Sequence, residues 1–164
     1  MSVLMRWVLR HRIAVAAGVF ALYSALMVSL DERMRRAGGP GILAFEFAGN
    51  GTRAYAMMDR WGVAGRRAAR LSLWLDFGYM LAYGTLAALL LGRARRIRGH
   101  SAVVPAVAAV AVGLDAVEGV SLLKVLDGVD GGANARRATT AATLKFAVLG
   151  GAAVYALVRR RKSA

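Results

Sequence analysis

The 164-residue sequence has no cysteine, only two prolines and only two histidines. The absence of cysteine excludes disulfide bonds, a thiol nucleophile and any metal site with cysteine ligands. His11 and His100 both lie beside the basic flanks of apolar segments, so we expect neither to act as a ligand. The chain also lacks the Walker, GxSxG and HExxH patterns, which excludes the enzyme classes that depend on those motifs.

Acidic residues are scarce as well, with 9 Asp and Glu against 23 Lys and Arg and a net charge of +14. Such an excess of basic residues can indicate nucleic-acid binding. Here the arginines gather at the ends of apolar segments, a pattern typical of helices that end at an anionic lipid surface. We therefore expect the lipid bilayer, and no nucleic acid, as a partner.

Four long apolar segments fill most of the chain, at about residues 13–32, 71–92, 101–126 and 138–158. Hydrophobic residues make up 58% of the sequence, and the mean hydropathy is +0.49. Each segment is long enough to cross a hydrocarbon layer of ~30 Å at ~1.5 Å per residue. The sequence therefore predicts an all-α polytopic membrane protein, a single integral domain over residues 1–164 with four transmembrane helices. We interpret the first segment as a retained anchor, because it ends in LDER and has no small-residue cleavage site.

Residues 41–62, between the first two apolar segments, predict a short helical region at the membrane surface. The run GGPG at 38–41 breaks the first helix, and Thr52 is the expected N-cap of a helix that ends near Arg60. Arginines mixed with Tyr55 and Trp61 suit an interfacial helix with its aromatic rings at headgroup depth.

The orientation follows from the short connections, which set topology more reliably than long ones. Four arginines lie within residues 93–98, against two, Arg136 and Arg137, between the last two segments. With four spans, the connection at 93–98 shares a side with both termini, which carry further basic residues at 6–12 and 159–162. We expect both termini in the cytoplasm and the protein in the inner, or plasma, membrane of a bacterial cell.

Charged residues inside the apolar segments are the strongest indication of a functional site. A charge within a span costs about 2.5–3.5 kcal/mol on insertion scales, so it usually faces a partner or a cavity. Asp115 and Glu118 are three residues apart and share one helix face. The predicted cluster lies in one half of the membrane, and its members are Asp76, Asp115, Glu118, Lys145 and, from the connection, Glu46.

Aromatic residues near this cluster suit a hydrophobic ligand. Asp76, Tyr79 and Tyr83 follow one another at helical spacing, which gives the second segment a polar stripe. We predict that Tyr79, Tyr83, Trp74 and Phe45, together with Lys145, contact the substrate. A divalent ion held by the carboxylates is an alternative, which the nearby Lys145 disfavours.

Four short blocks resemble those of a group of small bacterial four-helix integral membrane proteins of unassigned function. The blocks are FEFAG at 45–49, LDF at 75–77, LDAVE at 114–118 and LKF at 144–146. The resemblance implies a four-helix membrane fold and implies no activity.

Two classes of function remain open. In the first, the protein binds or transforms an isoprenoid or another lipid. Asp115 or Glu118 then acts as a general acid and Asp76 or Glu46 stabilises the cation or removes a proton, as in membrane terpene cyclases and sterol isomerases. In the second, the protein is a proton or cation transporter or an accessory subunit, and the charged cluster serves proton relay or locks the helices. We expect no cofactor and no metal, and a homo-oligomer or a protein partner is possible in either class.

Overall fold

The computed structural model of the chain describes residue 7 and residues 11–158, and all regular structure in this part is helical. The helices are α2 (Arg12–Arg36), α3 (Ile42–Glu46), α4 (Gly51–Arg98), the short 3₁₀ helix η1 (Val104–Ala106), α5 (Val107–Leu126) and α6 (Gly131–Leu157). Arg6, Arg10 and the basic residues at 159–162, which entered the orientation argument, lie outside the described residues.

Four of these helices are long and apolar enough to cross a membrane: Arg12–Arg36, Gly51–Arg98, Val104–Leu126 and Gly131–Leu157. They expose large apolar side chains on their outer faces, such as Leu22, Leu81 and Val154, each more than half accessible. An apolar outer surface of this extent is typical of a protein surrounded by lipid. The predicted all-α fold with four candidate spans is thus confirmed at the level of the helices.

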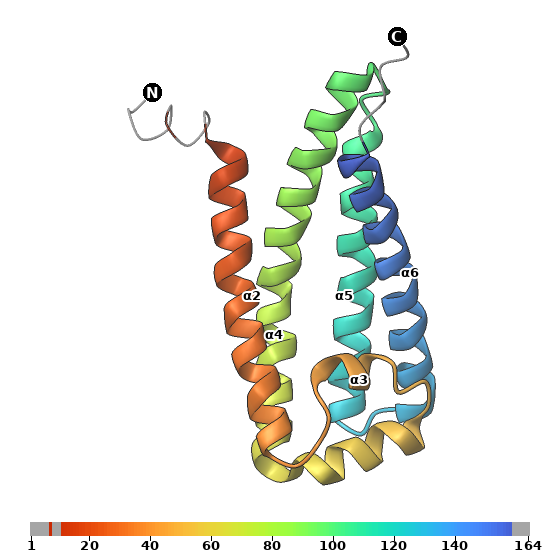
Figure 1. Cartoon of the computed structure of the whole chain (residues 1–164). Helices are drawn as coiled ribbons and strands as arrows, with labels where there is room; N and C mark the ends of the chain where they lie inside the picture. The colour runs from red at the N-terminus through yellow and green to blue at the C-terminus, as the bar shows by residue number, and fades with distance from the viewer. Residues whose placement is uncertain (1–6, 8–10, 159–164) are drawn as a thin grey trace.

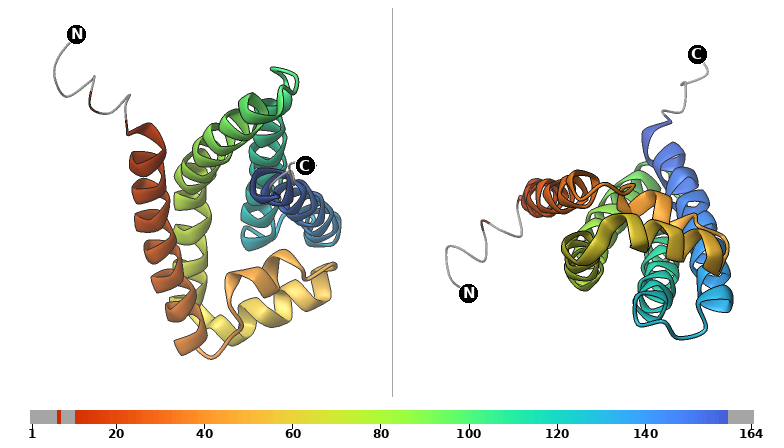
Figure 2. Two further views of the ribbon diagram at one scale, coloured as in Figure 1. Left: turned by 45° about the horizontal axis from the view of Figure 1, so that its top comes forward. Right: turned by 90° about the horizontal axis from the view of Figure 1, so that it is seen from below.

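The long helices form an open bundle (Figures 1 and 2). Among the described elements, α2 packs mainly against α4, α4 packs against α5, and α5 packs against α6, which also contacts α4. The main packed pairs do not join α2 to α6. The bundle therefore has a gap between its first and last helices, with α4 along one side of the gap.

A kink at Gly62 divides α4 into two parts. Gly62 has φ 55° and ψ −158°, a backbone conformation that favours glycine. Residues 51–61 therefore run across one end of the bundle, below the long upright part of α4 (Figure 1). The sequence predicted this break, but the N-cap prediction was wrong. Asn50, and not Thr52, caps the helix, with its side-chain oxygen accepting from the Arg53 N–H at 2.9 Å.

The crossing segment and α3 close this end of the bundle around a compact apolar core. Trp61 is 1% exposed, donates from Nε1 to the Pro40 carbonyl at 2.6 Å, and packs edge-on against Phe45. Trp61 therefore packs inside the protein, and the depth of residues 51–61 in the membrane stays a prediction. Other buried members of the core come from four further helices or turns: Met34, Ala48, Leu122, Val125 and Ala138.

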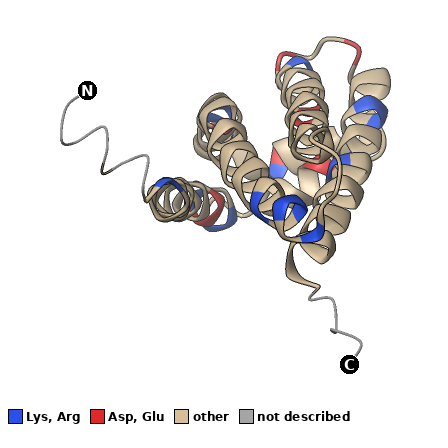
Figure 3. Ribbon diagram, turned by 90° about the horizontal axis from the view of Figure 1, so that it is seen from above, with Lys and Arg blue, Asp and Glu red and all other residues tan. Residues whose placement is uncertain are grey.

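The opposite end of the bundle is basic (Figure 3), with Arg95, Arg96 and Arg98 in the last turn of α4. The Arg98 guanidinium donates to the carbonyls of Tyr155 and Val158 and lies 4.3 Å from the centre of the Tyr155 ring. It thereby satisfies carbonyl groups at the end of α6, where a cation also complements the helix dipole.

Candidate functional site

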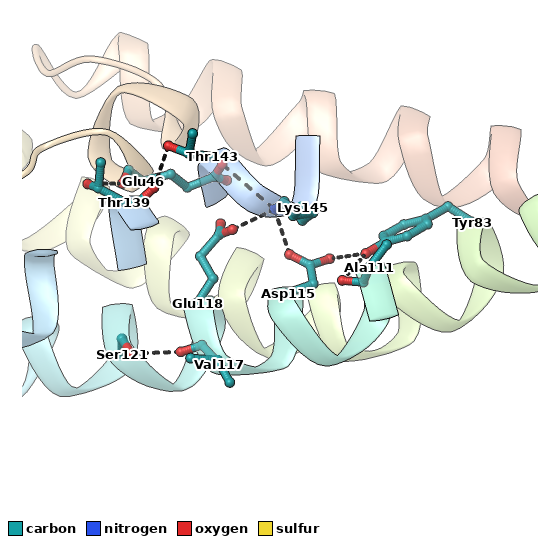
Figure 4. Close-up of polar contacts among 10 residues, drawn as sticks. All are labelled: Glu46, Tyr83, Ala111, Asp115, Val117, Glu118, Ser121, Thr139, Thr143 and Lys145. Atoms are coloured by element: carbon teal, nitrogen blue, oxygen red, sulfur yellow. Dashed lines mark hydrogen bonds and ion pairs between the residues drawn. The ribbon is translucent and has the colours of Figure 1, made fainter. Parts of the chain in front are cut away.

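Lys145 of α6 is the centre of a buried charged cluster (Figure 4). Its Nζ lies 2.6 Å from Asp115 Oδ1 and 2.7 Å from Glu118 Oε2, and both carboxylates come from α5. Glu46 Oε2 of α3 lies farther away, at 3.9 Å. All four side chains are nearly inaccessible. The cluster therefore joins three helices at the depth where α3 covers the bundle.

Asp115 is the most fully bonded carboxylate of the cluster. Besides Lys145, it accepts a hydrogen bond from the Tyr83 hydroxyl, 2.8 Å from Oδ2. Tyr83 is on α4, so this bond adds a fourth helix to the network (Figure 4). Each of the two Asp115 carboxylate oxygens therefore has a hydrogen-bond donor, and one of these donors is charged.

Glu46 is held in place through its backbone. The Thr139 hydroxyl of α6 donates to the Glu46 carbonyl at 2.7 Å and accepts from the Gly49 N–H at 3.0 Å. Asp31 of α2 accepts from the Ile42 N–H at 2.6 Å, which fixes the start of α3. These contacts tie the short helix α3 to both sides of the gap and place its last residue over Lys145.

Burial raises the pKa of the Glu46 carboxyl above its ordinary value, because the charged form loses water. Lys145 opposes this shift in pKa, and so does the adjoining Glu118 carboxyl as a hydrogen-bond partner. The charges of Asp115 and Asp31 add to the shift. Glu46 Oε2 accepts no hydrogen bond from the described residues. The raised pKa means that the Glu46 carboxyl keeps its proton to a higher pH than an exposed glutamate does.

A cavity of about 610 Å³ begins at the cluster and extends along the gap between α2 and α6. Asp76, Tyr79 and Tyr83 of α4 line it, together with Glu46, Asp115 and Lys145. Most of the remaining wall is apolar and includes Phe20 and Met27 of α2, Leu86 and Leu91 of α4, and Leu149 and Ala156 of α6. The cavity is thus a long apolar groove with carboxyl groups at one end.

Aromatic side chains form one wall of this groove. Tyr79 stacks on Phe20 of α2 with ring centres 5.5 Å apart, and it meets Tyr83 edge-on at 5.7 Å. The Tyr79 hydroxyl lies 3.3 Å from Ser24 Oγ. Asp76 lies one turn below Tyr79 on the same helix face, and no hydrogen bond or ion pair joins it to another described residue.

Several predicted site residues lie away from this cavity. Trp74 is 61% exposed on the outer face of α4, where it contacts Phe77. Phe45 is fully buried against Trp61 in the core. Glu118 belongs to the charged cluster but does not line the cavity. The spacing that places Tyr79 and Tyr83 beside Asp76 turns Trp74 to the opposite side of the helix.

The contribution of α2 was missed by the sequence analysis. Phe20, Ser24 and Met27 line the cavity at intervals of three to four residues, as expected for one helix face. Residues 13–30 of the first apolar segment carry no charge that would mark this face, and Asp31, which also lines the cavity, was read as the end of the segment. In the described part of the chain, no three His, Asp or Glu side chains are arranged to hold a metal ion.

Comparison with protein-family models, with curated proteins and with solved structures finds no match for this chain. The functional interpretation therefore rests on the geometry of the charged cluster and the cavity.

Proposed function

We propose that the protein is an integral membrane protein that binds an isoprenoid or another lipid in this cavity and transforms it by carboxyl general-acid chemistry. The observation that carries the proposal is the combination of a long apolar groove with carboxyl groups at its closed end. Such a site suits a ligand that is hydrophobic along its length and reactive at one point.

The dimensions of the groove support a chain-like ligand. On α4 the lining residues run from Asp76 to Leu91, which is about 22 Å along the helix at ~1.5 Å per residue. A volume of about 610 Å³ spread over this length leaves a narrow cross-section, so the groove is much longer than it is wide. A lipid chain fits this shape better than a compact polar metabolite does.

The gap between α2 and α6 supports entry from the side. These helices do not form a packed pair and lie apart in Figure 2. Residues of both line the cavity, so we infer that the groove opens between them. In a bilayer this opening faces lipid tails, so a hydrophobic molecule can enter without crossing water. The small side chains Ala152, Ala153 and Ala156 on α6 leave the width that such entry needs.

The hydrogen bonds favour Glu46 or Asp76 as the acid. Both oxygens of Asp115 already accept hydrogen bonds, one from Lys145 and one from Tyr83, and Glu118 lies outside the cavity. In the proposed reaction a protonated carboxyl gives its proton to an alkene carbon or an epoxide oxygen. The faces of Tyr79 and Tyr83 then stabilise the resulting cation, and a neighbouring carboxylate removes a proton to end the reaction. The sequence analysis had instead assigned the general acid to Asp115 or Glu118, and the removal of a proton to Asp76 or Glu46.

A second function, locking the helices, is favoured by the contacts of Lys145. One ammonium group between carboxylates of α3 and α5 would hold these helices together without any ligand. A proton relay has less support, because the upper groove is lined by Leu86, Leu90 and Leu91 and offers no polar path onward.

The proposal includes a placement in the membrane. The start of α2, the connection after α4 and the end of α6 then face the cytoplasm of a bacterial cell. Residues 51–61 lie at the opposite surface, where their exposed arginines Arg53 and Arg60 reach the headgroups.

Binding is tested by native mass spectrometry of the protein purified in detergent and incubated with a lipid extract of its own cells. Ala153→Phe places a ring in the groove, whereas Val154→Phe places the same ring on the outer face of α6. We expect a discrete lipid on the native protein and on Val154→Phe, and its loss from Ala153→Phe. Equal retention by all three proteins would rule out the groove as the binding site.

Turnover is tested separately with the lipid that binding identifies. Asp76→Asn and Glu46→Gln keep the size of each side chain but remove its acid. If the site is catalytic, at least one of them retains the lipid unchanged where the native protein converts it. If the native protein leaves the lipid unconverted, the site is a binding site or a structural lock and the enzyme proposal fails.

A further inference from the structure

A second cavity, of about 450 Å³, lies between α2 and α4 at the end of the bundle closed by the Gly62 kink. It is separate from the groove described above, and the two share no lining residue. Its walls are the last turns of α2 and the start of the upright part of α4. The lining includes Leu30, Arg33, Arg36, Arg67 and Leu71.

The charge of this second cavity is of one sign. Three arginines line it, and no acidic residue does. Arg36 forms an exposed ion pair with Glu32 at 2.9 Å. Within residues 11–158, neither Arg33 nor Arg67 forms an ion pair with an acidic side chain. Two exposed guanidinium groups on different helices are thus available to one ligand.

The helix dipole does not explain this arrangement. Arg33 and Arg36 lie in the last turns of α2, where a cation complements the partial negative charge of the helix end. Arg67 lies inside α4, several residues after the kink, and gains nothing from a helix end. A role in binding an anion accounts for Arg67 as well as for Arg33.

The position of the cavity indicates what kind of anion it takes. On α4 the charged run that ends at Arg70 gives way to the apolar stretch that begins at Leu71, and on α2 the apolar stretch ends at Leu30. Leu30 and Leu71 therefore line the side of the cavity toward the candidate spans, and the arginines line the side toward the membrane surface. A ligand that matches both sides carries a phosphate and hydrocarbon on one molecule.

We propose that this cavity binds the phosphate of an anionic phospholipid, with the acyl chains lying over the exposed Leu71. The planar guanidinium groups of Arg33 and Arg67 pair with the phosphate oxygens, which a guanidinium can bind in a bidentate manner. The bound lipid would bridge α2 and α4 beside the kink.

The test uses the full chain in detergent, titrated with phosphatidylglycerol or with phosphatidylcholine of the same acyl chains, and counts bound lipids by native mass spectrometry. The variant is Arg33→Gln with Arg67→Gln. Its matched control is Arg60→Gln with Arg66→Gln, which removes the same charge from the same end of the molecule but outside the cavity. We expect the native protein and the control to prefer phosphatidylglycerol, and the cavity variant to bind it about tenfold more weakly.

Three results would overturn the proposal. Equal weakening in the control and the cavity variant would mean a general attraction of the basic end for anions. An unchanged preference in the cavity variant would place the lipid elsewhere. Inorganic phosphate that competes as well as the lipid does, molecule for molecule, would identify a free phosphate as the ligand. Circular dichroism of each variant confirms that its helices are intact before binding is compared.

Discussion

Replacing Lys145 by methionine removes the only cation that directly contacts the buried carboxylates of the cluster in the described structure. Methionine has a similar length and no charge, so the packing volume changes little. Asp115 Oδ1 and Glu118 Oε2, now 2.6 and 2.7 Å from Nζ, lose their charged partner while remaining buried. Removing one partner of a buried ion pair costs about 3–5 kcal/mol, because it leaves an uncompensated charge. We therefore expect Lys145→Met to be among the most destabilising single substitutions in the chain.

The assay is thermal unfolding in a fixed detergent, followed through tryptophan fluorescence. Trp61 is fully buried in the core beside the cluster, so its emission reports opening of this end of the bundle. For a chain of this length a loss of 3–5 kcal/mol corresponds to a fall in the melting temperature of roughly 6–20 °C. Lys124→Met is the control, because it removes the same charge from an exposed position on α5. The control should shift the melting temperature by little, as exposed charges contribute ~0–1 kcal/mol.

A second substitution separates charge from packing. If uncompensated charge is the cause, adding Asp115→Asn and Glu118→Gln to Lys145→Met should restore much of the lost stability. A fall of less than about 1 kcal/mol in Lys145→Met would refute the reasoning, because the ion pairs would then contribute no more than an exposed pair. A large fall that the triple variant does not recover would instead assign the effect to packing.

Four other substitutions give further expected outcomes. Tyr83→Phe removes the 2.8 Å hydrogen bond to Asp115 and should lower the free energy of unfolding by about 1.5–3 kcal/mol, measured by the same melting assay. Because burial raises the pKa of Glu46 above its value in the unfolded chain, the folded state retains this proton to a higher pH, so stability should fall as the pH rises above 4.5. Glu46→Gln should flatten that fall. A Cβ at Gly84 would lie 2.5 Å from a methyl group of α5, so Gly84→Ala should cost about 1–3 kcal/mol. Gly113→Ala meets no atom within 4 Å and should add about 0.5–1 kcal/mol.

The helical architecture was predictable because apolar length and charge placement act locally along the chain. The break at Gly62 was also predictable, because glycine disfavours a continuous helix and the sequence predicts a helix that ends near Arg60. The direction in which residues 51–61 turn was not, because it depends on the contact of Trp61 with Pro40 and Phe45, which are distant in sequence. The capping residue was misplaced for a similar reason. Asn50 and Thr52 are both good caps, and only the backbone path selects Asn50.

The contacts of Lys145 with Asp115 and Glu118 were predictable from depth, because charges at matching heights in a bundle of antiparallel spans tend to meet. Asp76, predicted for the same cluster, forms no ion pair with a described residue. Helix rotation was not available from the sequence. The rotation of α5 turns Glu118 toward Lys145 and away from the cavity. The rotation of α4 turns Trp74 to the outer face. The role of α2 was the hardest to foresee, since an uncharged apolar helix gives no signal of which face it presents. Such faces are decided by packing against α4.

The members of the charged cluster differ in how much of their presence the fold explains. Asp115 and Lys145 satisfy each other at 2.6 Å, and Tyr83 completes the Asp115 carboxylate, so a structural role accounts for them. Asp76 has no such partner among the described residues, and it lines the mostly apolar groove at its carboxyl end. A carboxyl group beside apolar side chains lowers the stability of the fold, whereas a leucine at the same position would not. No contact with a described residue offsets this cost. The sequence nevertheless places an acid there, next to two tyrosines that line the same wall. The helix-locking explanation therefore accounts for the centre of the cluster but not for its cavity-facing edge, and that edge is where a bound molecule would meet an acid.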